Sequence, residues 1–212
     1  MEDLTKFIED GHPIDIVYLD FKKAFDSVPH QRLPSKLAAY GITGNIFKWI
    51  KDFLTNRHQR NHYSPMTEVL SGIHQGSVLG PIQFTIFIND LPDCVQSCCK
   101  FFADTKIYDS TDNAGKIEED IIRLQRWSDL WNLYFNVTKC KILHIVKNNQ
   151  EIVYKMKLSE YNYDNIVKCE EEKDLGVIFD KYLSFDAHIQ NSINKANSMI
   201  DIIRRTFTFI DL

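Results

Sequence analysis

The sequence lacks a run of apolar residues long enough to cross a membrane. Its longest apolar-looking stretch, Ile82 to Leu91, is about half of the roughly 20 residues that a transmembrane helix needs. A secretory signal is also missing, because the opening residues MEDLTKFIEDG are acidic and contain no apolar run. We therefore expect no membrane partner and an intracellular location, with nucleus and cytoplasm not distinguished.

An excess of basic residues is missing as well. Lys and Arg together number 25 against 29 Asp and Glu, which gives a net charge of −4. This balance excludes a strongly basic coat for nucleic acid, so any contact with a polyanion must come from a local patch. One such patch is present in the first half of the chain, formed by Lys48, Lys51, Arg57 and Arg60.

Cysteines able to build a disulfide framework are few. The 5 cysteines are an odd number, and Cys98 and Cys99 are adjacent, which disfavours a conventional bridge between them. We expect free thiols in a reducing compartment.

Neither internal repeats nor a flexible linker divide the chain. Its 212 residues are 44% hydrophobic and 25% charged, which is typical of a soluble domain that buries its own core. The patterns predict a strand over Ile14 to Phe21 ending at Asp20, helices from Leu33 and Ile46, and a buried helix after Pro81. Further predicted elements are a hairpin over Lys100 to Tyr108, a helix over Ile117 to Tyr134 capped by Asp112 or Asn113, strands at CKILHIV, YKMKL and DLGVIFD, and a closing helix over Ile189 to Ile203. This order lacks strict strand–helix alternation and indicates the α+β class.

Two aspartates stand where metal chemistry is plausible. Asp20 closes an apolar strand, and Asp104 lies at the predicted turn of a hairpin. A buried carboxylate is costly unless it is paired or binds a cation, and Mg²⁺ is held by one or two carboxylates together with phosphates and waters. The alternative is that each carboxylate merely reaches solvent at the end of its strand.

A glycine-rich segment, SGIHQGSVLGP, precedes the predicted helix at Pro81. Its backbone N–H groups suit a phosphate or a nucleotide backbone. It is not a phosphate-binding loop of the nucleoside triphosphatase type, because no Gly-Lys-Ser/Thr closes it. Phe25 follows Asp20 closely, and by itself it reads as a core aromatic residue.

Several segments together carry a family resemblance. YLDFKKAFDSVPH, SGIHQGSVLGPIQFTIFINDL, FFADTKIY, FNVTKCKILHI and EEKDLGVIFD occur in order, at suitable spacing. They resemble the reverse transcriptase of non-LTR retrotransposons of the jockey/CR1-like type. The resemblance implies an RNA-directed DNA polymerase that acts on an RNA template, a DNA primer and dNTPs with Mg²⁺ or Mn²⁺.

The resemblance also implies catalytic roles. Asp20 and Asp104 correspond to the metal-binding aspartates, and Phe21 offers its backbone carbonyl to the same site. Lys139 corresponds to a suggested proton donor to the leaving pyrophosphate. Two divalent ions held in this way activate the primer 3′-hydroxyl and stabilise the leaving oxygen.

Further residues correspond to substrate contacts of the family. Phe25 matches the aromatic gate under the sugar, and Gln75 and Gly76 match the motif that cradles the incoming nucleotide and template. The primer grip corresponds to a hairpin that includes Leu175, Gly176 and Val177. The implied fold is a right-hand polymerase: a palm over residues 1–180, an antiparallel sheet packed on helices, with a partial fingers insert at about 31–72. Residues 181–212 would begin a truncated thumb or connection helix.

The sequence departs from the family pattern at the hairpin. The family has two aspartates where this chain has Asp104 followed by Thr105, and a one-residue deletion explains the site better than a substitution. Because a slip of one residue turns strand side chains to the opposite face, we expect weaker binding of at least one ion. His74 replaces a usual proline, and the segment between Arg57 and Ser71 is short.

These departures, with upstream fingers that the sequence does not show, leave three hypotheses. The first is an impaired polymerase, and the second is a non-catalytic remnant or nucleic-acid-binding module. The third is a single-metal phosphodiesterase built on Asp20 and Asp104, which has no support beyond the two carboxylates. The sequence leaves the oligomeric state open.

Overall fold

A five-stranded sheet forms the centre of the protein. The computed structural model describes residues 11–55, 58–59, 67–73, 76–101, 105–145, 148–159 and 161–207. The sheet has the order β4-β5-β1-β6-β9, in which only the β6–β9 pair is parallel. Its strands are β1 (Ile14–Leu19), β4 (Cys98–Phe101), β5 (Thr105–Ser110), β6 (Lys141–Ile145) and β9 (Val167–Cys169). Helices around a mainly antiparallel sheet confirm the expected α+β class.

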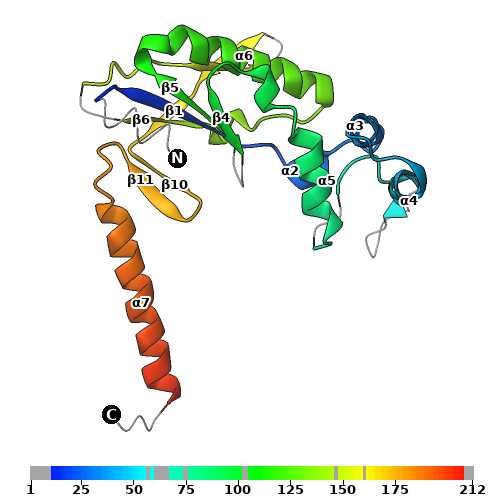
Figure 1. Cartoon of the computed structure of the whole chain (residues 1–212). Helices are drawn as coiled ribbons and strands as arrows, with labels where there is room; N and C mark the ends of the chain where they lie inside the picture. The colour runs from blue at the N-terminus through cyan, green and yellow to red at the C-terminus, as the bar shows by residue number, and fades with distance from the viewer. Residues whose placement is uncertain are drawn as a thin grey trace.

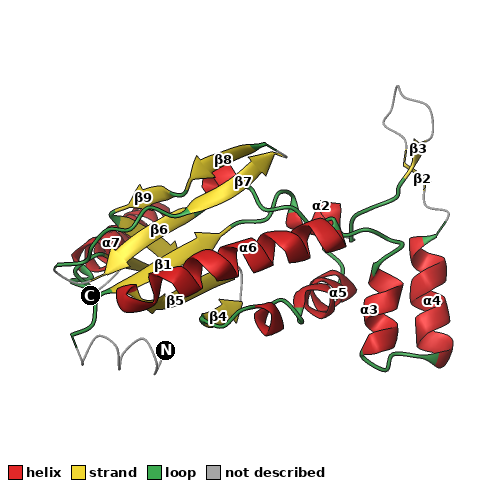
Figure 2. Ribbon diagram, turned by 90° about the horizontal axis from the view of Figure 1, so that it is seen from above, coloured by secondary structure: helices red, strands yellow, loops and turns green. Residues whose placement is uncertain are grey.

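The central strand β1 is buried along its whole length. Val17 and Leu19 belong to a core cluster with Leu124 of α6 (Ala114–Trp131), the helix that lies along one face of the sheet in Figures 1 and 2. On the opposite face, Ile16 and Tyr18 belong to a second cluster. Because both faces of β1 are covered, its sequence is a nearly continuous apolar run rather than an alternating one.

Four further helices lie toward one end of the sheet (Figure 1). They are α2 (Ala24–Ser27), α3 (Leu33–Ala39), α4 (Gly44–Leu54) and α5 (Leu79–Ile88). Lys36 joins α3 to its neighbours: its side chain is 3% exposed, pairs with Asp90, and places Nζ 3.8 Å from the ring centre of Trp131. Burial lowers the pKa of Lys36, although Asp90 acts in the opposite direction. The sequence patterns did not predict this buried cation.

Hairpins, single-turn helices and a terminal helix complete the structure. The hairpins are β2 (His58–Gln59) with β3 (Thr67–Glu68), β7 (Lys155–Ser159) with β8 (Asn162–Asn165), and β10 (Glu171–Asp174) with β11 (Val177–Asp180). The 3₁₀ turns are η1 (Pro92–Cys94), η2 (Thr111–Asn113) and η3 (Val137–Lys139). Helix α7 (Asp186–Thr206) has no buried residue and extends away from the sheet (Figure 1).

Three predictions about elements were wrong in part. The α5 segment was expected to be buried on nearly every side, but Ile82 is 49% exposed, because the helix buries only the side formed by Gly80, Gln83, Phe87 and Ile88. Helix α6 ends at Trp131 rather than Tyr134, because Asn132 takes a left-handed conformation (φ 54°) and turns the chain. The segment DLGVIFD is not one strand, since a turn at Leu175 and Gly176 divides it between β10 and β11.

Candidate active site

Asp20 directly follows β1 and is held by the backbone around it. Its carbonyl oxygen accepts a hydrogen bond from Asn136 N at 2.7 Å, and Lys22 N donates to Tyr134 O at 2.7 Å. Between them, Phe21 forms an antiparallel bridge with Phe135, and the two rings stack with centres 4.6 Å apart. The end of the central strand is therefore fixed on one side by the segment that leads into η3.

The Asp20 side chain is 38% exposed and faces a pocket of about 290 Å³. Lys139, Lys141 and Glu172 also line this pocket. Lys139 Nζ lies 3.6 Å from Asp20 Oδ2. Because the Lys139 side chain is 70% exposed, the ion pair contributes little to stability. The structure thus brings together two predicted catalytic side chains that are far apart in the sequence.

The second predicted metal ligand, Asp104, lies outside the described residues. The strands that lead to it and away from it are described, and Phe101 of β4 pairs with Thr105 of β5. The ladder between β1 and β5 ends at Leu19 and Thr105, which are the sequence neighbours of Asp20 and Asp104. Gln75, His74, Arg57 and Arg60 are outside the described residues as well.

Phe25 occupies a fixed position close to the glycine-rich segment. Its ring stacks on Phe84 of α5 with centres 4.8 Å apart, and its carbonyl oxygen accepts from Ile73 N at 2.7 Å. Gly72 allows the glycine-rich segment to lie this close to α2, because a Cβ atom at this position would be 3.2 Å from Asp26 O. Its φ of +102° is also one that residues with a side chain rarely adopt. Gly76 also has a left-handed φ of +83° and is exposed. Phe25 is only partly buried and does not belong to either core cluster, so neither its reading as a core aromatic residue nor the sugar-gate role is confirmed.

The β10–β11 hairpin turns at Leu175 and Gly176, which have positive φ angles of 49° and 88°. Positive φ at both central residues is the requirement of a type I′ turn, which glycine meets without strain and leucine rarely adopts. Leu175 is 63% exposed at the tip, and Val177 begins β11.

Two ion pairs fasten this hairpin to the central sheet. Lys106 of β5 pairs with Asp174, and Lys141 of β6 binds Glu172 at 2.7 Å. Lys106 and Lys141 flank Tyr18 on either side of β1. The hydrogen bond that Lys141 donates to the Glu172 carboxylate raises the pKa of Lys141. Sequence reasoning missed all four charged residues; the available signal was a lysine inside each of two apolar strands.

The oxygen donors of this site supply only part of the set of ligands that a divalent cation needs. Among the residues that the structure describes, no group of three or more His, Cys, Asp or Glu side chains is arranged to hold a metal. Asp20 supplies a partly exposed carboxylate, which is the ligand type that Mg²⁺ takes from proteins, while Glu172 is engaged by Lys141. Burial raises the pKa of the neighbouring Cys140 thiol to about 11, so this group stays protonated at neutral pH.

None of the described helices is both long and apolar enough to cross a membrane.

Comparison with known proteins assigns the chain to a family. Residues 9–184 match the family described as reverse transcriptase (RNA-dependent DNA polymerase), and the chain belongs to this family. The predicted resemblance is thereby confirmed.

Three curated relatives come from mobile elements of Drosophila melanogaster. The chain is 27% identical to the probable RNA-directed DNA polymerase from transposon BS over 95% of its length, and 30% identical to that from transposon X-element over 82%. It is 26% identical to the RNA-directed DNA polymerase from mobile element jockey, again over 82%. The chain spans 24%, 20% and 20% of the lengths of these relatives.

Proposed function

We propose that this chain forms the polymerase region of a non-LTR retrotransposon reverse transcriptase and joins dNTPs to the 3′-hydroxyl of a DNA primer on an RNA template. The observation that carries the proposal is the meeting of Asp20 and Lys139 at the end of the central strand, within a chain of this family. The wording of the relatives' names, RNA-directed DNA polymerase, supports the reaction class.

Each residue has a proposed role in this reaction. Asp20 and Asp104 would hold Mg²⁺ or Mn²⁺, which when bound supplies activation of the primer 3′-hydroxyl and neutralises charge on the phosphates. Asp20 is suited to this role because its backbone is hydrogen-bonded on a rigid strand end. The Lys139 ammonium group is available to pass a proton to the departing pyrophosphate.

The substrate contacts are proposed in the same way. Phe21, whose ring stacks on Phe135, would offer its backbone carbonyl to the metal site. Phe25, whose ring stacks on Phe84, would support the sugar. Gln75 and Gly76 would position the incoming nucleotide. The hairpin tip formed by Leu175, Gly176 and Val177 would contact the primer end. Two ion pairs hold this hairpin against Lys106 and Lys141, which flank β1 close to Asp20.

The arrangement supports a division into polymerase subdomains. The central sheet with α6 would be the palm, over residues 1–180. Helices α3 and α4 lie beyond the end of the sheet (Figure 2) and would form the partial fingers insert at about 31–72. Helix α7, which extends away from the sheet, would begin the thumb or connection over 181–212.

Thr105 supports the proposal that catalysis is impaired. It follows Asp104 where the family has a second aspartate, and its side chain is 3% exposed. It pairs with Leu19, so it lies on the face of the sheet opposite to Tyr18 and Lys106. A buried threonine on that face does not replace the missing carboxylate. This favours a second reading, a non-catalytic remnant that still binds nucleic acid.

Primer extension on an RNA template tests the proposal. Three proteins are compared: the chain itself, its Asp20→Ala variant, and a variant with an aspartate inserted after Asp104. We expect slow Mg²⁺-dependent extension by the chain, none by Asp20→Ala, and faster extension by the insertion variant. The remnant reading predicts no extension by any of the three, with RNA binding that Asp20→Ala leaves unchanged.

A further inference from the structure

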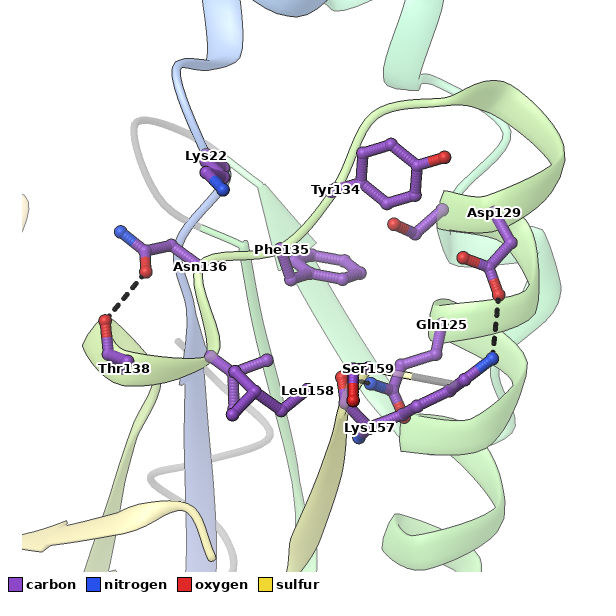
Figure 3. A pocket seen from close by; sticks show the side chains of 12 residues that line it. Lys22, Gln125, Asp129, Tyr134, Phe135, Asn136, Thr138, Lys157, Leu158 and Ser159 are labelled. Atoms are coloured by element: carbon purple, nitrogen blue, oxygen red, sulfur yellow. Dashed lines mark hydrogen bonds and ion pairs between the residues drawn. The ribbon is translucent and has the colours of Figure 1, made fainter. Parts of the chain in front are cut away.

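A second and larger pocket lies behind the segment that pairs with Asp20. It has a volume of about 690 Å³ and is lined by Lys22, the later turns of α6, residues 134–138 and the end of β7. This volume lies within the range of about 300–1,000 Å³ that is usual for small-molecule sites. Figure 3 shows the pocket from close by. We call it the α6–β7 pocket.

The walls of the α6–β7 pocket combine an apolar surface with polar groups. Phe135, Val137 and Leu158 supply the apolar part, while Lys22, Asn136 and Ser159 are among its polar residues. In Figure 3, Phe135 and Leu158 lie between Lys22 on one side and the Asp129–Lys157 pair on the other. Such walls suit a ligand that has a flat apolar body and a charged group.

The charge that the pocket offers is positive. Lys22 is exposed and forms no ion pair with a carboxylate in the described part of the chain. Lys157 Nζ lies 3.8 Å from Asp129 Oδ2, and both side chains are at least 36% exposed, so this pair is weak. With one lysine balanced by Asp129 and one left over, the pocket favours an anionic group near Lys22.

The wall formed by β7 contains a β-bulge that places an apolar side chain in the pocket. The pairing of β7 with β8 shifts between Lys157 and Ser159, and Leu158 at this bulge is 47% exposed. The backbone of Lys157 is fixed to α6 through Gln125, whose amide donates to Lys157 O at 3.0 Å and accepts from Lys157 N at 3.1 Å. The bulge thus presents an apolar side chain from a firmly held strand, as bulges near binding sites do.

We propose that the α6–β7 pocket binds a nucleotide, with its base against Phe135 and Leu158 and its phosphate at Lys22. The aromatic and aliphatic walls fit a base, and the unbalanced lysine fits a phosphate. The pocket adjoins the Asp20 pocket and shares only Thr138 with its lining, and the proposal does not depend on nucleotidyl transfer by this chain.

The walls of the α6–β7 pocket contact the backbone around Asp20. Phe135 stacks on Phe21, and Lys22 N is hydrogen-bonded to Tyr134 O, so the walls are continuous with the end of β1. Thr138 lines both pockets and precedes Lys139. A bound nucleotide would therefore restrain the segment that carries Lys139.

Calorimetric titration with ATP in EDTA tests the proposal, because chelation removes divalent ions from the Asp20 site. We expect binding with Kd below about 1 mM, and weaker binding by about tenfold in both Lys22→Gln and Leu158→Glu. Lys155→Gln is the matched control, because Lys155 is an exposed residue of the same strand outside the pocket. Lys155→Gln, Leu158→Met and Asp20→Asn should all bind as the unchanged chain does.

Five results would overturn the proposal. The first four are no detectable ATP binding, an affinity that Lys22→Gln and Leu158→Glu leave unchanged, an equal loss of affinity in Lys155→Gln, and a loss of ATP binding in Asp20→Asn. Pyrophosphate that binds as tightly as ATP would also contradict it, because the base would then contribute nothing. Thermal unfolding of each variant shows that it is folded, and Lys22→Gln preserves the test if Leu158→Glu does not fold.

Discussion

The ion pair between Lys139 and Asp20 adds little to the stability of the protein. Their charged atoms are 3.6 Å apart, and both side chains are more than a third exposed, so water screens the attraction. We predict that Lys139→Ala changes the free energy of unfolding by less than about 0.5 kcal/mol. Extension activity should fall by about a hundredfold if Lys139 donates a proton to the leaving group.

Urea denaturation and single-nucleotide extension measure these two effects. Lys155→Ala, which changes an exposed lysine away from the Asp20 pocket, serves as the control for charge alone. A large loss of stability with unchanged extension would contradict the assignment of Lys139.

One buried cysteine, Cys140, and two partly buried ones, Cys99 and Cys169, make the stability of the protein depend on pH. Burial raises the pKa of the Cys99 thiol to about 12 and that of Cys140 and Cys169 to about 11, from an ordinary 9.0. Above pH 9 the unfolded chain loses these protons before the folded one does, so the unfolded state gains relative stability. We predict a free energy of unfolding that is insensitive to these thiols below pH 9 and falls between pH 9 and about 12.

Alkylation by iodoacetamide, followed by mass spectrometry, tests the same groups directly. Cys140 and Cys99 should react far more slowly in the folded chain than in denaturant at pH 8, because the thiolate is the reactive form. Equal rates in both states would show that the thiols are not shielded.

At the scale of elements, the β10–β11 hairpin depends on ion pairs for its attachment to the central sheet. The Lys106–Asp174 ion pair, with side chains 20% and 10% exposed, joins it to β5. We predict that Lys106→Glu or Asp174→Lys alone destabilises the protein by about 2–4 kcal/mol, because each leaves like charges facing one another in a mostly buried position. The double exchange should recover much of the loss.

Chemical denaturation of the two single variants and the double variant forms a cycle that isolates this pair. If the effects of the single changes simply add in the double variant, the two side chains do not interact as described.

The sequence predicted elements well where periodicity was strong. The repeat Ile46, Trp49, Ile50 and Phe53 predicts α4, and Ile117 to Trp131 predicts α6. Periodicity does not say how much of an apolar face is covered: Ile50 is buried, whereas Ile46 and Trp49 are 66% and 53% exposed. The residue pattern alone predicted one strand over DLGVIFD, whereas the resemblance implied a hairpin there, and the structure has a hairpin. Gly176 is a local signal for the turn, but Leu175 is not, because leucine rarely takes positive φ.

For the site, the sequence predicted single residues better than their partners. The resemblance located Asp20 and Lys139, and the structure places them side by side. The pairs Lys106–Asp174 and Lys141–Glu172 join positions on different strands, which composition and periodicity do not reveal. The buried Lys36 was missed for the same reason, since its aromatic neighbours come from α5 and α6.

At the scale of the whole molecule, stability is unevenly distributed. Helix α7 has no buried residue, whereas Ile117, Ile121 and Leu124 of α6 are almost fully buried. Helices depend mainly on packing for their stability, so α7 should open with a small free energy. We predict that amides of α7 exchange with deuterium within seconds, while those of β1 and α6 remain protected for hours.

Hydrogen–deuterium exchange with mass spectrometry resolves these segments as separate peptides. Protection of α7 equal to that of α6 would show that it is covered in solution, and the account of the whole molecule would then be wrong in this respect.

The central claim is that Asp20 and Asp104 together form one site for a divalent cation. Electron paramagnetic resonance of Mn²⁺ measures this directly, because the signal of the free ion decreases as the ion binds. We predict that Asp20→Asn and Asp104→Asn each weaken Mn²⁺ binding at least about tenfold, because a site with one or two carboxylates loses much of its charge. Asp52→Asn, which changes an exposed aspartate of α4, should have no effect. Binding by Asp20→Asn that equals that of the unchanged chain would contradict the claim.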